Sequence, residues 1–324
     1  MPTQWPRLSR RSRRSAPVVA IDWRDDGWLA GWIDPIDHQR HHLSRPMAPD
    51  DAVDDAIDDA NGPQLEWAGS VGRWLRDHIG PIQGVVMALP ASVVWHAWVP
   101  EPAEFNDTDA TAMAASFPQA WRDAGWTLTP WGADPHCVDV GPSHDPRQQG
   151  VGATTTEVGQ WWVAAEPGVV ARYQAFARRA GVSLLRLDVR AAVLARAVQR
   201  RHSGDWPVVL VDCHRGQTQW LVVDHNGVRG VQSFAHRRLS AAEHADHLAA
   251  QLQPVVGQHG IQACVPTGEP FDRLDEVAAL LGVALVRACG VITTDAGGVL
   301  ACTAGVDGLV DGLVNSGGVR VNGI

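Results

Sequence analysis

Lysine is absent from this chain of 324 residues, so arginine supplies all 27 of its permanently basic side chains. Without lysine, the chain has neither the lysine of a Walker-type phosphate loop nor one that forms a Schiff base. Cysteine is also scarce, and no two cysteines form a C-x-x-C pair. The five are Cys137, Cys213, Cys264, Cys289 and Cys302. This spacing fits a reducing compartment better than a disulfide framework or a zinc site.

The chain also lacks an apolar run of the ~18 residues that a membrane span requires, and no apolar stretch follows its arginine-rich start. We therefore expect a cytoplasmic protein with at most peripheral membrane contact. The net charge is −9, yet residues 1–16 carry only positive charge, from Arg7, Arg10, Arg11, Arg13 and Arg14. This arm is either disordered and solvated or a contact with an anionic membrane surface, and the acidic remainder argues against nucleic-acid binding.

Two similar segments each contain a β-branched strand that ends in an aspartate, a tight turn and a returning strand. The first strand ends at Asp22 and returns through residues 29–33, and the second ends at Asp212 and returns through residues 220–223. Actin-like proteins hold a nucleotide's metal and phosphates on such turns, once in each of two related lobes. The repetition therefore predicts a duplicated α/β fold. The two carboxylates are candidates for metal binding or for capping their own turns.

The composition of both turns is poorly suited to phosphate. Backbone amides approach an anion closely where the turn is built from Gly, Ser or Thr, whereas the first turn places Asp25 and Asp26 where phosphate would lie. In the second turn, His214 and Arg215 precede Gly216 and offer cationic side chains in place of glycine amides. The sequence thus predicts a protein that keeps the two-turn architecture but has lost catalytic activity.

Apolar periodicity and turn residues predict the remaining elements. Helices are expected over residues 64–79, 111–124, 167–180, 189–201, 241–252, 271–281 and 300–313, and strands over 84–90, 93–99, 160–165, 184–188, 261–265 and 283–287. Residues 50–59 pair their aspartates instead of alternating them as a calcium loop does, and His38, His41 and His42 are expected to be exposed. We therefore predict no metal site.

The composition changes along the chain and suggests domain boundaries, because Trp, Pro and polar residues increase after residue 90. We divide the chain into a basic disordered arm, a first lobe that is interrupted by a small α+β subdomain, and a second lobe whose 2B part is reduced. In that order the segments are 1–16, 17–90, 91–166, 167–205 and 206–324.

In their order, these segments resemble the PilM-like type IV pilus assembly proteins, which are actin-like proteins of the FtsA/PilM group. The resemblance lies in residues 18–33, 84–90, 180–188 with 191–197, and 208–227. It implies an actin-like, ribonuclease H-like duplicated fold of two lobes, with an inserted subdomain in the first. It also implies a nucleotide site around Asp22, Asp212, Gly216 and Thr218, with Gly268 in the adenosine-side turn.

That nucleotide site is degenerate compared with the family. The first glycine of the second phosphate turn is lost, one glycine remains in the adenosine-side turn, and residues 238–262 hold one helix where nucleotide-binding relatives have a further subdomain. The resemblance therefore implies no cofactor, with ATP and Mg²⁺ as the alternative.

The function implied is a non-catalytic scaffold of a type IV pilus or a related secretion or DNA-uptake machine. Such a protein lies at the inner membrane and binds the cytoplasmic tail of a PilN-like membrane protein, in a groove that would include Val93, Trp95 and Trp98. The odd spacing of the two tryptophans places them on opposite faces of their strand. The alternatives are an actin-like ATPase, a sugar or acetate-type kinase with Asp188 as its catalytic aspartate, or the cytoplasmic domain of a GspL-like secretion protein.

Overall fold

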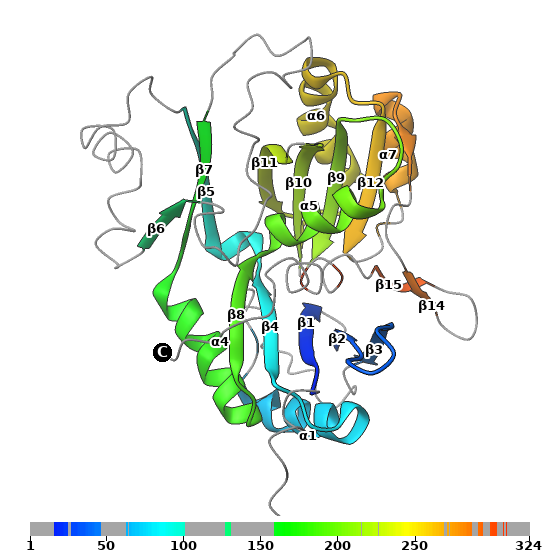
Figure 1. Ribbon diagram of the computed structural model, residues 1–324. Helices are drawn as coiled ribbons and strands as arrows, with labels where there is room; N and C mark the ends of the chain where they lie inside the picture. Colours follow the sequence, from blue (N-terminus) through cyan, green and yellow to red (C-terminus); the bar gives the residue numbers. More distant parts are fainter. Residues whose placement is uncertain are drawn as a thin grey trace, which may run out of the picture.

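The computed structural model describes residues 16–24, 27–46, 63, 65–100, 127–130, 159–214, 216–225, 227–268, 271, 273–286, 291–293, 299–302, 307 and 309. Two five-stranded mixed sheets organise these residues into two lobes (Figure 1). The first sheet consists of β3 (Arg40–Pro46), β2 (Gly27–Ile33), β1 (Val18–Arg24), β4 (Gly84–Leu89) and β8 (Leu184–Val189), in that order. The second consists of β11 (Gly227–Ala235), β10 (Gln217–Asp224), β9 (Val208–His214), β12 (Ala263–Gly268) and β13 (Ala284–Leu285).

The two sheets repeat one topology. In each, three sequential strands form an antiparallel meander, and two further strands pair in parallel beyond its first strand. β1 therefore corresponds to β9, and the two predicted aspartates occupy equivalent positions in equivalent central strands. Each strand continues two residues beyond its aspartate, to Arg24 and His214, instead of ending there as predicted. The predicted duplicated, two-lobed α/β fold is confirmed.

Helices cover both faces of each sheet, and strand alternation decides which side chains they contact. On the first sheet, Val19, Ile21 and Trp23 pack against α1 (Ala68–Ile79) and α4 (Pro167–Ala180). On the second sheet, Val209 and Val211 pack against α6 (Ala241–His259) and α7 (Leu274–Leu281). Asp22 and Asp212 follow the opposite alternation, so their side chains lie on the remaining face of each sheet.

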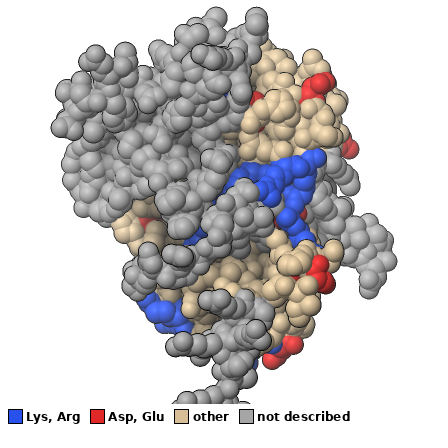
Figure 2. All heavy atoms as spheres, viewed as in Figure 1, with Lys and Arg blue, Asp and Glu red and all other residues tan. Residues whose placement is uncertain are grey.

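Helix α5 (Arg190–Arg201) lies on that remaining face and packs against both lobes (Figure 1). Its Val193 contacts Ala20 and Val86 of the first sheet, whereas Leu194 packs with Leu210 of the second. Nine of its successive residues, 190–198, are buried, as expected for a helix segment enclosed on all sides. Figure 2 shows arginine side chains gathered over the part of the visible face where α5 lies in Figure 1.

Helix boundaries follow local signals in the sequence. Pro167 occupies the first turn of α4, and Gly181 ends that helix in the left-handed region, with φ of 69°. Ser240 and Glu243 form a capping box at the start of α6. α6 continues to His259 through Pro254, seven residues beyond the predicted end at residue 252. Within the described residues, no helix has the length and apolarity needed to cross a bilayer.

A third sheet, in the order β5-β7-β6, follows the first-lobe strand β4. Its strands are β5 (Val94–Pro100), β7 (Gly159–Ala165) and β6 (Thr127–Pro130), and the short helix η5 (Ala91–Val93) precedes β5. The predicted helix over residues 111–124 lies outside the described residues, as do residues 1–15 of the basic arm. The domain boundaries given above stay a prediction.

The predicted helix over residues 300–313 is wrong at its start. Residues Val299–Cys302 form strand β15, which pairs with β14 (Val291–Thr293) in an antiparallel ladder. Val, Ile and Thr dominate β14, and such side chains favour pleated structure.

The crossing of α1 and α4 yields a test of this packing. A Cβ atom at Gly72 would lie 1.9 Å from the carbonyl oxygen of Ala180 in α4, whereas a Cβ at Gly69 would meet nothing within 4 Å. Gly72→Ala should therefore lower the free energy of unfolding by about 1–3 kcal/mol. Gly69→Ala, in the same helix, should raise it by up to about 1 kcal/mol. Urea unfolding of both variants measures this, and equal effects would contradict the close crossing.

Candidate functional site

The two hairpin aspartates are joined by one buried arginine. Arg190, the first residue of α5, donates from Nε to Asp212 Oδ2 at 2.6 Å and from Nη2 to Asp212 Oδ1 at 3.0 Å. Its Nη1 donates to Asp22 Oδ1 at 2.5 Å. The three residues are only 2% (Arg190), 4% (Asp22) and 1% (Asp212) exposed. Both carboxylates are therefore bound to a guanidinium that the chain itself supplies.

The local structure explains why these three groups meet. Asp22 and Asp212 lie on the α5 face of their sheets, and α5 begins directly after β8, the strand beside β4. Arginine carries a planar fork of five N–H donors, so it can hold one carboxylate with two bonds and still reach another. An ammonium group could not do this with the same geometry, because it is a compact point charge.

The charges of this cluster depend on one another. Burial alone would lower the pKa of Arg190, but the charges of Asp212 and Asp22 and their hydrogen bonds raise it above its usual value. The guanidinium therefore stays charged. Removing one member of a buried ion pair typically costs about 3–5 kcal/mol, because the other charge remains buried without compensation.

The position of Arg190 opposes a metal ion between the two aspartates. The guanidinium already binds both oxygens of Asp212 and Oδ1 of Asp22, at 2.5–3.0 Å. Mg²⁺ would need to approach carboxylate oxygens to about 2.0–2.1 Å, beside this buried positive charge. The residues therefore fit an internal cation and do not fit Mg²⁺ while Arg190 holds this position.

The surroundings of Asp212 stabilise this arrangement. Thr267 of β12 donates its hydroxyl to Asp212 Oδ1 at 3.1 Å. Gly268, the predicted adenosine-side glycine, follows with φ of 75°, and a Cβ atom there would lie 2.6 Å from the same oxygen and 2.2 Å from the carbonyl oxygen of Cys213. Glycine is therefore required at 268 for the close approach of β12 to β9.

A second buried cluster surrounds Asp188, the residue considered for a kinase. Its Oδ2 accepts from Arg186 Nη2 at 2.6 Å and from Arg196 of α5, and its Oδ1 accepts from the backbone N–H of Val189 at 2.8 Å. Asp188 is 1% exposed. Both carboxylate oxygens thus bind groups of the first lobe and α5, as a structural ion pair does.

The remaining residues of the second turn lie apart from Arg190. The Thr218 hydroxyl bonds to His236 Nδ1 at 2.9 Å and to His244 Nε2 at 2.6 Å, on the α6 face of the sheet and away from Asp212. The side chain of Arg237 covers Gly216, since a Cβ there would lie 2.0 Å from its Cγ. The side chain of His214 and all of Arg215 lie outside the described residues, as do Asp25 and Asp26.

The predicted partner-binding residues lie on or next to β5. Val93 is 2% exposed and packs in the first-lobe core. Trp95 and Trp98 pair with Ala164 and Trp161 of β7, and their side chains lie outside what the structure describes.

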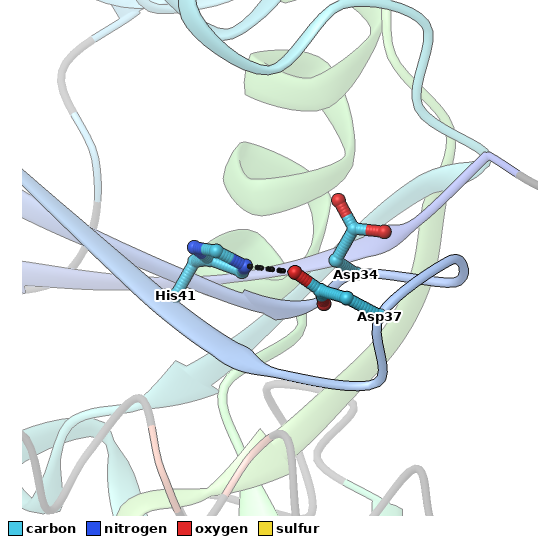
Figure 3. Close-up of side chains that lie close together, drawn as sticks. All are labelled: Asp34, Asp37 and His41. Atoms are coloured by element: carbon cyan, nitrogen blue, oxygen red, sulfur yellow. Dashed lines mark ion pairs between the residues drawn. The ribbon is translucent and has the colours of Figure 1, made fainter.

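One group of potential metal ligands occurs in the described part of the chain, at the turn between β2 and β3. Oxygen and nitrogen atoms of Asp34, Asp37 and His41 lie within 4.8 Å of one another, and Figure 3 shows the imidazole directed at Asp37. The two carboxylates accept the backbone N–H groups of Ile36 and Gln39, each at 2.7 Å. These bonds give the carboxylates a role in shaping the turn.

Sequence reasoning missed Arg190, Arg196 and Thr267. One local signal existed for the arginines: both lie in the stretch 190–198, whose other residues are all Ala, Val or Leu. An arginine in such a helix requires a buried anionic partner, and the chain's strand-end aspartates were the available candidates.

The chain was also compared with known proteins. No protein-family model and no curated protein sequence matches it. The solved PilM–PilN type IV pilus biogenesis complex is similar in structure, with a TM-score of 0.57 and 13% identity over 94% of this chain and 99% of that one. A Bacteroides thetaiotaomicron protein with an actin-like ATPase fold and unknown function gives a TM-score of 0.50 and 7% identity, over 90% and 95%. At these identities the likeness establishes the fold and leaves the activity open.

The stacking of His236 on His244 predicts that the free energy of unfolding depends on pH. The two rings stack with centroids 4.3 Å apart, and burial, with the nearby charges of His236 and His247, lowers the pKa of His244 from 6.5 to about 4. Between these values the unfolded chain binds the proton and the folded protein does not. The free energy of unfolding should therefore fall as the pH drops from 6.5 towards 4.

His244→Gln should reduce this slope in urea unfolding at pH 7 and pH 5. Burial also lowers the pKa of His96 to about 4, so part of the slope should persist. His78→Gln, on the exposed side of α1, should keep the full slope. An unchanged slope in His244→Gln would contradict the assignment.

Proposed function

We propose that this chain is a non-catalytic actin-like scaffold of a type IV pilus or a related secretion or DNA-uptake machine. One observation carries the proposal: Arg190 binds Asp22 and Asp212, the aspartate of each lobe that an actin-like protein uses for its nucleotide's metal. With this internal cation in place, the chain needs no bound cofactor. The absence of lysine and the acidic first turn point the same way.

The partner in this proposal is the cytoplasmic tail of a PilN-like inner-membrane protein. The solved relative named above is a PilM–PilN complex, which supports a partner of this kind. The β5 strand offers a binding edge, because β7 pairs with one side of it and no strand among the described residues pairs with the other. An extended peptide can add to such an edge through main-chain hydrogen bonds.

The tail would hold the protein at the cytoplasmic face of the inner membrane. The arm with Arg7, Arg10, Arg11, Arg13 and Arg14 would add a second, weaker contact with anionic lipid. In this arrangement the membrane protein supplies the anchor and the two-lobed body supplies a rigid docking surface. The bound tail would therefore determine where the scaffold assembles.

Nucleotide binding tests the non-catalytic part of the proposal. Isothermal titration of the purified protein with Mg-ATP should give no saturable heat, because the guanidinium of Arg190 holds both carboxylates. A parallel titration with ATP and EDTA controls for binding that does not involve the metal. Magnesium-dependent binding with micromolar affinity would refute the proposal and favour an actin-like ATPase or a sugar or acetate-type kinase.

Peptide binding tests the partner. A fluorescent peptide with the N-terminal tail sequence of the PilN-like protein should bind the wild-type protein, and a scrambled peptide should not. The odd spacing of Trp95 and Trp98 predicts opposite faces of their strand, so one of Trp95→Ala and Trp98→Ala should weaken binding by at least about thirtyfold, as loss of an interface tryptophan does.

The matched control is Leu280→Ala, which removes an exposed apolar side chain from α7 in the second lobe. It should leave the affinity for the peptide unchanged. Failure of the wild-type protein to bind the tail peptide, or equal losses in all three variants, would contradict the proposed docking site.

A further inference from the structure

The position of Arg190 has a mechanical consequence in addition to its chemical one. Asp22 belongs to the first sheet and Asp212 to the second, and the same guanidinium binds both. Two buried carboxylates that face one interface repel each other unless a cation lies between them. The guanidinium converts that repulsion into an attraction across the lobe interface.

We propose that Arg190 is a clamp that holds the two lobes in one closed arrangement without any ligand. This inference rests on the proposed function, because it requires that no nucleotide binds between the lobes. A docking surface on the first lobe and its inserted subdomain would then be permanently formed. Partner binding would not depend on nucleotide exchange.

The geometry favours a clamp over an incidental ion pair. The contact consists of three charged hydrogen bonds of 2.5–3.0 Å, two to one lobe and one to the other. Thr267 fixes the Asp212 carboxylate from a neighbouring strand. Exposed ion pairs contribute little, because water competes for each group, but these residues are at most 4% exposed.

A second cluster of ion pairs, centred on Asp307, holds the other end of α5. Asp307 is 2% exposed and accepts from Arg40 Nη1 of β3 at 2.9 Å. The same residue pairs with His42 of β3 at 2.8 Å and with Arg201, the last residue of α5, at 3.4 Å. Arg201 lies eleven residues after Arg190, about 16 Å further along the helix. Ion pairs thus hold both ends of α5, and the Arg190 end binds a carboxylate of each sheet.

The Asp22→Asn variant tests the clamp directly. It removes the negative charge of the Asp22 side chain and leaves Arg190 paired with Asp212. No buried charge therefore loses all its partners. Without nucleotide, we expect hydrogen exchange in β1 and β9 to accelerate by on the order of ten- to a hundredfold, as for the loss of one charged hydrogen bond. Small-angle X-ray scattering should show a larger radius of gyration than for the wild-type protein.

Asp188→Asn is the matched control. It neutralises an equally buried carboxylate that binds an arginine of α5, but this pair lies within the first lobe and α5. The variant should lose stability and keep the wild-type radius of gyration. If both variants change the radius equally, or if neither changes it, the clamp is wrong.

Arg190→Lys provides a second variant that keeps the positive charge. A single ammonium cannot replace the three hydrogen bonds of the guanidinium. The lobes of this variant should therefore separate as in Asp22→Asn, with a similar increase in the radius of gyration. A closed Arg190→Lys protein would overturn the clamp. These outcomes are separate from those of the proposed function, because the scattering comparison uses neither nucleotide nor tail peptide.

Discussion

The structure depends on a positive charge between two buried carboxylates. The central strand of each lobe carries an aspartate, two residues before its end, on the face that α5 covers. Burial of both anions requires a counter-charge. A nucleotide-binding protein of this fold meets the requirement with a metal ion from solution. In this chain the counter-charge is covalently attached, because α5 begins with Arg190 at the point where the two sheets meet.

This replacement explains several features that are otherwise unrelated. Without lysine, only arginine is available as a permanent cation, and its fork geometry is the one that can hold two carboxylates at once. In the proposed scaffold no phosphate binds at the turns, so acidic and bulky residues are tolerated where glycine would otherwise be needed. The Thr218 hydroxyl forms hydrogen bonds with the imidazoles of His236 and His244 on the opposite face of the second sheet.

Much of the fold could be predicted from the sequence, because its signals are local. β-branched runs ending in Asp22 and Asp212 predicted both hairpins, and Pro167 with Gly181 predicted the limits of α4. The helix predicted from residue 300 failed because glycine is compatible with close helix packing and with turns between strands alike. The length of α6 was underestimated because Pro254 lies inside it.

The candidate site could be predicted only in part. Asp22 and Asp212 were identified, whereas their partner Arg190 lies 168 and 22 residues away in sequence. Periodicity within one segment carries no information about such a pair, which is created by the packing of α5 between two sheets. The same holds for Asp188, whose position near the end of a strand suggests catalysis and whose partners Arg186 and Arg196 indicate a structural ion pair.

The most direct measurement of the central claim is a crystal structure of the protein grown with MnCl₂ and a non-hydrolysable ATP analogue, with anomalous data collected at the manganese edge. The account predicts the Arg190 guanidinium between Asp22 and Asp212 and no anomalous peak there. A manganese peak bound to both carboxylates, with the arginine displaced, would contradict it.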